Sequence, residues 1–205
     1  MRLPIVLDTC TILNLLRIDE DEFLYKKLIK LEINICQSVF DEANRNVKTK
    51  TFSENQRKYI SSHIPQLVPF IIRCDEQFEK EYKACIQEFC DYKKENGEFY
   101  STLISLYLCR QKQCRLYFYT DDYPAKRDFD SFFNYQQIGI IGDTIDLLVF
   151  LYWSNPDFDQ RKLEKYLQNL LSEFATPFKE FHNQFNHVTK EDFYKIINKI
   201  GEIKV

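Results

Sequence analysis

Glycine is scarce in this 205-residue chain, which contains only 4 of them. The glycine-rich loops that cradle phosphates need several glycines at fixed spacing, and neither GxGxxG nor GxxxxGK[ST] occurs. Histidine is also rare: the 3 histidines, at positions 63, 182 and 187, have no spacing that matches a zinc site. No apolar run approaches the roughly 20 residues of a membrane span. These absences argue against nucleotide-loop enzymes, zinc enzymes and membrane proteins.

The cysteines are an odd number, 7, and none forms a CxxC pair. Most of them lie beside apolar residues, which favours reduced, buried thiols over a disulfide framework. The chain start, Met1 to Pro4, leads straight into an apolar strand pattern, so we expect no signal peptide. We therefore expect a cytoplasmic protein.

The bulk composition is that of a globular protein, with 44% hydrophobic and 29% charged residues. The length suits one well-buried domain and a modest extension. A net charge of −3 argues against a surface that coats nucleic acid broadly. It leaves room for a local basic groove, or for a carboxylate cluster that holds divalent cations.

Short apolar segments alternate with helical patterns over the first 153 residues. We expect strands at residues 3–7, 33–36, 67–72, 115–119 and 137–141. This alternation predicts an α/β fold with a parallel sheet and helices on both faces. Pro69 places the third of these strands at a sheet edge, because proline cannot donate to a central ladder.

After Asn155-Pro156 the strand pattern stops, and helices are expected near 157–174, 177–184 and 189–200. We therefore divide the chain into an α/β domain, residues 1–153, and a helical C-terminal extension packed on it, residues 154–205. Within the first domain, Gly97 is predicted to end a long helix that begins at Asp75. The next segment, from Glu98, is apolar nearly all round and predicts a buried helix.

Five acidic residues share one context, the end of a predicted strand or the first turn of the helix that follows. They are Asp8, Glu42, Glu98, Asp121 and Asp122. Because strand ends and helix starts gather at one edge of a parallel sheet, we expect these acids to converge. Packed carboxylates repel one another, and a divalent cation relieves that repulsion. Oxygen ligands of this kind suit Mg²⁺ or Mn²⁺.

The chain resembles the PIN-domain ribonucleases, which include toxins of bacterial toxin–antitoxin pairs. Four motifs carry the resemblance over about residues 3–150: Ile5-Val-Leu-Asp-Thr-Cys-Thr-Ile-Leu-Asn14, Val39-Phe-Asp-Glu42, Gly97-Glu98 and Tyr119-Thr-Asp-Asp122. Each motif is weak alone, but the four in this order are fairly specific.

The resemblance implies a PIN-like three-layer α/β/α fold with a central parallel sheet, and Mg²⁺- or Mn²⁺-dependent cleavage of RNA. The metal-binding acids it implies are Asp8, Glu42, Glu98 and one of Asp121 and Asp122, of which the TxD form of the motif favours Asp122. Thr9 and Thr120 match supporting polar positions. The partners it implies are an RNA substrate, an antitoxin protein for a toxin, and a second copy in a homodimer, with no membrane.

Simpler structural roles compete with these assignments. Asp8 is alternatively a turn or helix cap, and Glu98 a favourable charge at a helix N-terminus. Ser38 and Asp41 fit a capping box, which leaves Glu42 as the candidate ligand. Asp143 and Asp146 are interpreted as a cap and a surface residue.

Other functions also compete. A haloacid-dehalogenase-type phosphatase usually needs a DxD arrangement, and Asp8-Thr-Cys10 lacks the second acid. The non-enzymatic alternative is a catalytically inactive binding module on a PIN fold, acting through a protein or RNA partner.

Overall fold

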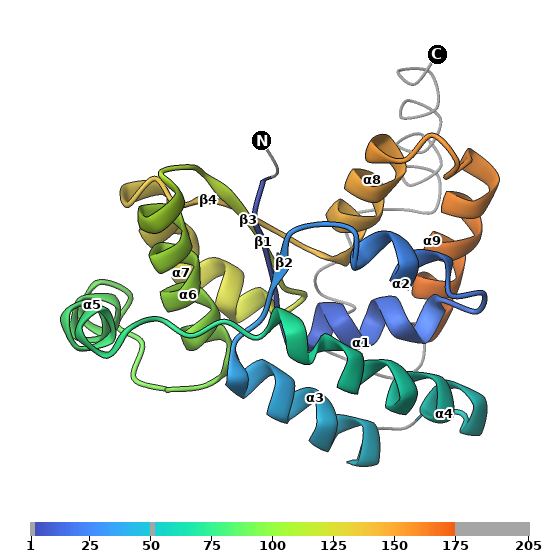
Figure 1. Ribbon diagram of the computed structural model, residues 1–205, viewed down its shortest axis with the longest axis horizontal. Coiled ribbons are helices and arrows are strands. Elements are labelled where there is room, and N and C mark those ends of the chain that lie inside the picture. The colour runs from blue at the N-terminus through green and yellow to red at the C-terminus, as the bar shows by residue number, and fades with distance from the viewer. Residues whose placement is uncertain (1–2, 50–51, 175–205) are drawn as a thin grey trace. The chain divides into compact units, whose positions relative to one another are not determined.

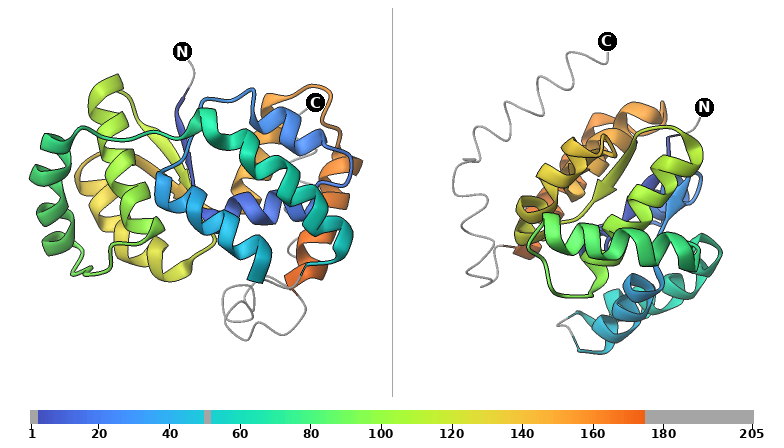
Figure 2. Two further views of the ribbon diagram at one scale, coloured as in Figure 1. Left: turned by 60° about the horizontal axis from the view of Figure 1, so that its bottom comes forward. Right: turned by 90° about the vertical axis from the view of Figure 1, so that its left-hand side faces the viewer.

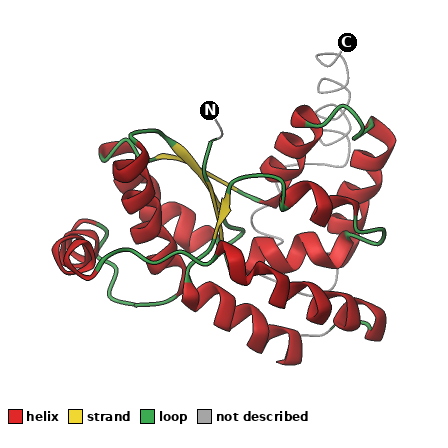
Figure 3. Cartoon of the chain, viewed as in Figure 1, coloured by secondary structure: helices red, strands yellow, loops and turns green. Residues whose placement is uncertain are grey.

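The computed structural model describes residues 3–49 and 52–174, and in this part the protein is an α/β structure that is mostly helical (Figure 3). The strands are β1 (Ile5–Leu7), β2 (Ile33–Asn34), β3 (Leu116–Tyr119) and β4 (Gly139–Gly142). The α-helices are α1 (Thr9–Ile18), α2 (Phe23–Leu28), α3 (Gln37–Thr49), α4 (Glu54–His63), α5 (Glu76–Phe89), α6 (Gly97–Lys112), α7 (Tyr123–Tyr135), α8 (Thr144–Ser154) and α9 (Gln160–Phe174). A 3₁₀ helix, η1, covers Ile64–Phe70.

The chain divides into two compact units, Met1–Leu147 and Leu148–Val205. The first unit contains the whole sheet and ends within α8. In the second, the ring of Phe158 makes edge contacts with Tyr152 and Tyr166, at centroid distances of 5.8 and 5.9 Å. The helices predicted near 177–184 and 189–200 lie outside the described residues.

The four strands form one parallel sheet in the order β2-β1-β3-β4 (Figure 1). The predicted parallel α/β sheet is thereby confirmed. The chain runs outward from β1 to β2, then crosses back to place β3 on the other side of β1. Leu7 at the end of β1 pairs with Tyr119 at the end of β3. The strand order therefore reverses between these two strand ends, where open parallel sheets bind ligands.

The predicted strand at residues 67–72 is wrong over most of its length. Residues 64–70 form η1, and only Ile71 joins the sheet, through a single parallel bridge to Ile35. Pro65 and Pro69 explain the difference, because each lacks an N–H group and holds a backbone angle that a tight helical turn accepts. The predicted edge position is correct, since this bridge lies beyond β2.

Helix α6 is the buried helix that the sequence predicts, and Phe99, Leu103 and Leu106 are fully inaccessible. It lies between α5 and the sheet (Figures 1 and 2). The predicted role of Gly97 is wrong. The preceding helix already ends at Phe89, and Gly97 is instead the first residue of α6.

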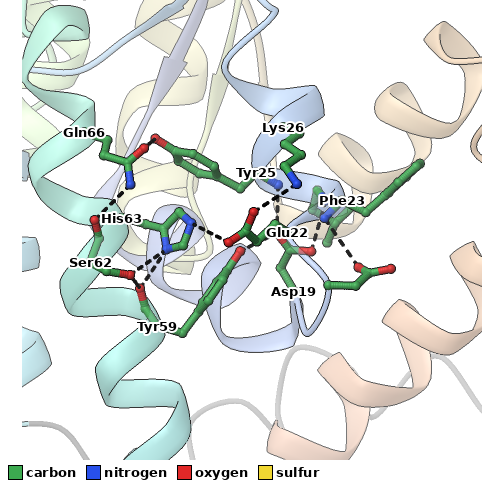
Figure 4. Close-up of polar contacts among 11 residues, drawn as sticks. Asp19, Glu22, Phe23, Tyr25, Lys26, Tyr59, Ser62, His63 and Gln66 are labelled. Carbon is green, nitrogen blue, oxygen red and sulfur yellow. Dashed lines mark hydrogen bonds and ion pairs between the residues drawn. The ribbon is translucent and has the colours of Figure 1, made fainter.

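The turn between α1 and α2 is fastened to α4 by a buried polar cluster (Figure 4). The Asp19 carboxylate accepts hydrogen bonds from the backbone of Leu24 and Tyr25 and from the Tyr59 hydroxyl, at 3.0, 2.8 and 2.8 Å. His63 lies between the rings of Tyr25 and Tyr59. These bonds explain how a carboxylate and an imidazole are buried here, because each finds partners.

All seven cysteines are free thiols, as predicted, but only Cys36 and Cys109 are buried and the other five are half-buried. Among the described helices, none has the length and apolar character needed to cross a bilayer.

Candidate active site

Asp8 lies directly after β1, and its residue is only 2% exposed. Its backbone N–H donates to the Tyr119 carbonyl at 3.0 Å, which continues the sheet ladder. Although Asp8 flanks the start of α1, its side chain makes no capping hydrogen bond. Asp8 is therefore the N-cap residue of α1 by position, but its side chain does not cap the helix. Burial raises the pKa of this carboxyl group above its ordinary value.

The two carboxylate oxygens of Asp8 have different surroundings. Oδ2 accepts hydrogen bonds from the Cys10 thiol at 2.9 Å and from the Thr120 hydroxyl at 3.0 Å. Oδ1 is buried and has no hydrogen-bond partner. An ionised acceptor left unpaired in this way is costly, and such a group calls for a specific explanation.

Glu42 projects from α3 toward the same strand end. Its Oε2 accepts a 3.2 Å hydrogen bond from the Thr9 hydroxyl, and its Oε1 accepts a 3.3 Å bond from the Asn46 amide. Thr9 immediately follows Asp8, so this bond joins the start of α1 to α3. The position of Glu42 is thus fixed from both of its oxygens.

Gly97 forms the floor between these two acids. A Cβ atom added to Gly97 would lie 3.2 Å from Glu42 Oε2 and 3.5 Å from Asp8 Oδ1. The two oxygens therefore face one small volume that a side chain at position 97 would occupy. The glycine is used here for close approach, since it leaves this volume free.

Glu98, the next residue, is half-buried in the first turn of α6. Burial raises the pKa of its carboxyl group to about 7, and the negative charges of Asp8, Asp122 and Glu42 add to the effect. The charges that act on Glu98 thus come from the end of β1, from α3 and from the segment that follows β3. We call Asp8, Glu42, Glu98 and Asp122 the carboxylate cluster.

Asp121 and Asp122 are neighbours in sequence but have different roles. Asp122 caps α7, with Oδ1 accepting a 3.1 Å bond from the Ala125 backbone. Asp121 accepts hydrogen bonds from the Asn14 amide at 2.7 Å, from the Thr144 backbone at 2.8 Å and from the Thr144 hydroxyl. Asp121 thus ties α1 to the start of α8, and both of its oxygens are occupied within the protein.

Three other polar residues have structural roles. Asp143 and Asp146 exchange backbone-to-side-chain bonds of 3.0 Å at the start of α8, a capping box. The predicted capping box at Ser38 is wrong, because α3 begins one residue earlier, at Gln37. Asp41 instead accepts a 2.9 Å bond from the Gln37 side chain.

Three contributors to the site were not predicted from sequence: Cys10, Asn14 and Thr144. From the sequence, Cys10 is predicted only to be one of seven reduced thiols, whereas its Sγ contacts Asp8. Cys10 and Asn14 both lie within the motif that begins at Ile5, and that position was the available signal. Nothing local marks Thr144, because its contact with Asp121 forms only when β3 and β4 pair.

The residues of the carboxylate cluster fit a hard divalent cation. The fit rests on the unpaired Asp8 Oδ1, on the volume kept free by Gly97 and on an all-oxygen donor set. As they stand, however, no three His, Cys, Asp or Glu side chains within residues 3–49 and 52–174 are arranged to hold a metal ion. Mg²⁺ needs only one or two carboxylates, because waters and substrate phosphate complete its coordination.

No family model, curated protein or solved structure matches the chain.

Proposed function

We propose that this protein is a Mg²⁺- or Mn²⁺-dependent ribonuclease that hydrolyses RNA phosphodiester bonds at the ends of β1 and β3. The observation that carries the proposal is the buried, unpaired Oδ1 of Asp8 beside Glu42 and Glu98. A divalent cation would be the missing partner of that oxygen. Burial is the main reason that the pKa of Glu98 is raised, and the cation would relieve the repulsion from Asp8, Asp122 and Glu42 that adds to it.

The finer fold we propose is the three-layer, PIN-like α/β/α arrangement. The strand order β2-β1-β3-β4 supports it, and so does the fifth parallel position that Ile71 takes beside Ile35. The four PIN-like motifs supply the residues at the reversal of strand order. The helical extension after residue 153 would be an addition to this core.

Asp8 and Glu42 would hold the cation, with Glu98 and Asp122 completing the acidic wall. When bound, Mg²⁺ or Mn²⁺ lowers the pKa of a water and stabilises the leaving oxygen of a phosphodiester. The chain itself supplies orientation: Thr120 holds Asp8 Oδ2, Thr9 holds Glu42, and the Ala125 N–H group holds Asp122. No covalent nucleophile from the protein is required.

The test is cleavage of a labelled single-stranded RNA, and of total RNA on a denaturing gel, with Mg²⁺, with Mn²⁺ and with EDTA. We expect cleavage in either cation and none in EDTA. Asp8→Asn and Glu98→Gln should each reduce the rate at least about a hundredfold while the protein stays folded. Asp41→Asn, a neighbour of Glu42 with a structural contact, is the matched control and should cleave normally. Wild-type rates in both site variants would overturn the assignment.

The second candidate is a catalytically inactive binding module on the same fold. The observation that favours it is that no three side chains of the described residues are arranged to hold a metal ion. Calorimetric titration with Mn²⁺ separates the two: the ribonuclease should bind Mn²⁺ and lose that binding in Asp8→Asn, whereas the module should not bind it. A toxin with an antitoxin partner is a narrower form of the first proposal, and a small DNA-binding protein encoded next to the gene would support it.

A further inference from the structure

The Cys10 thiol lies between the ends of the two central strands. Its Sγ donates to Asp8 Oδ2 at 2.9 Å and accepts a hydrogen bond from the Asp121 backbone N–H at 3.0 Å. The sulfur therefore bridges the segment that follows β1 and the segment that follows β3.

Two donors hold one oxygen of Asp8, and none holds the other. The Thr120 hydroxyl reaches the same Oδ2 at 3.0 Å, so both hydrogen bonds fall on one side of the carboxylate. Oδ1 has no hydrogen-bond partner, although Asp8 is buried and only 2% exposed. That bare oxygen points toward the volume above Gly97, where it lies 3.5 Å from the position of an added Cβ.

We propose that Cys10 is a positioning residue of the metal site, which together with Thr120 fixes the Asp8 carboxylate so that Oδ1 faces the cation. The inference rests on the proposed function and goes beyond it, because it assigns the thiol a role through Asp8. Without the thiol donor, Asp8 Oδ2 keeps only the hydrogen bond from Thr120, so the carboxylate is oriented less firmly. It would then have to be ordered again when the cation binds. Outer hydrogen-bond partners of this kind typically change metal affinity by about 10- to 100-fold.

The test is Mn²⁺ affinity of the full chain, measured by calorimetry or by electron paramagnetic resonance of free Mn²⁺. Cys10→Ala should weaken Mn²⁺ binding at least about tenfold. Cys10→Ser keeps a donor and an acceptor, and should stay within about threefold of wild type. Cys109→Ala is the matched control, because the buried Cys109 thiol contacts the Gln137 carbonyl. It should leave the affinity unchanged.

Each outcome has one meaning. Unchanged affinity in Cys10→Ala, with binding still lost in Asp8→Asn, overturns the positioning role and leaves the proposed function standing. Equal losses in Cys10→Ala and Cys109→Ala also overturn it, since the effect is then general. If wild-type protein does not bind Mn²⁺, the proposed function fails first. If Cys10→Ala does not fold, Thr120→Val is used instead, because it removes the other donor to Asp8 Oδ2. Thr120→Val should weaken Mn²⁺ binding, and Cys10→Ser should not. Weakened binding in Cys10→Ser with unchanged binding in Thr120→Val would overturn the positioning role of Cys10.

Discussion

The Thr120 hydroxyl donates a 3.0 Å hydrogen bond to Asp8 Oδ2 across 112 positions of the sequence. The bond forms because β1 and β3 are paired so that Leu7 lies opposite Tyr119. The residues that follow these two strands, Asp8 and Thr120, therefore lie side by side where the strand order reverses. The same hydroxyl accepts from the Asp122 backbone N–H at 3.1 Å, so it links the first and last members of the carboxylate cluster.

The two adjacent aspartates should respond differently to amidation. Asp121→Asn places an amide donor against the Asn14 and Thr144 donors, which should lower the free energy of unfolding by about 2–3 kcal/mol. Asp122→Asn keeps a good helix cap, so its stability should change by less than about 0.5 kcal/mol. Its Mn²⁺ affinity should nevertheless fall, because a charge is lost. Denaturant unfolding and Mn²⁺ titration of both variants check this, and the reverse pattern would make Asp121 the ligand.

The stability of the metal-free protein should fall as pH rises from about 4.5 to about 7. In the folded protein the pKa of Glu98 is raised from 4.5 to about 7, so over this range the folded state binds more protons than the unfolded state. The stability that protonated Glu98 contributes is present at low pH and is lost as the pH rises through the pKa of Glu98 in the folded protein. Because Glu98 is half-buried, we expect a loss of about 1–3 kcal/mol.

Glu98→Gln should flatten this pH dependence, as measured by thermal unfolding in EDTA between pH 4.5 and 8. The control is Glu88→Gln, which changes an exposed glutamate near the end of α5 and should leave the slope intact. Identical slopes for wild type and Glu98→Gln would contradict the raised pKa of Glu98. Asp8, whose pKa is also raised, contributes a slope of the same sign in both proteins.

Gly97→Ala should separate stability from metal binding. Alanine is the better helix residue and should not lower the melting temperature by more than a few degrees. Its Cβ would lie 3.2 Å from Glu42 Oε2, so the Glu42 carboxylate must give way by a few tenths of an ångström, and it would fill the space 3.5 Å from Asp8 Oδ1. We expect weaker Mn²⁺ binding with a folded protein, measured by calorimetry beside circular dichroism. Unchanged affinity would mean that the volume above Gly97 is not where the cation lies.

Tyr123 should contact RNA if the ribonuclease proposal holds. It directly follows Asp122 and is 54% exposed, so its ring is available for stacking on an unpaired base. Tyr123→Ala should weaken binding of a labelled single-stranded RNA in EDTA about tenfold, and Tyr123→Phe should not. Tyr135, at the opposite end of the same helix and 70% exposed, is the control. Fluorescence anisotropy measures both, and equal losses would indicate a nonspecific effect.

Local patterns in the sequence determined the strands of the sheet and the types of residue in the site, but not the helix boundaries at Gly97 and Ser38. Short apolar runs predicted the four strands of the parallel sheet, because alternation of strands and helices is readable within a window of a few residues. The acids that follow these runs, Asp8 and Asp122 among them, were predicted as site residues for the same reason. The buried character of α6 also follows from its own composition.

Only the tertiary structure decided which oxygen of which acid is left without a partner. Asp121 and Asp122 have the same chemistry and neighbouring positions, and they are distinguished by Asn14 and Thr144, which approach from α1 and the start of α8. The sequence around Gly97 is equally compatible with the end of one helix and with the start of the next. The close approach of Gly97 to Asp8 and Glu42 depends on the packing of α6 against β1. Hydrogen bonds between distant segments depend on strand register, and register is set by the whole core and not by any one stretch of chain.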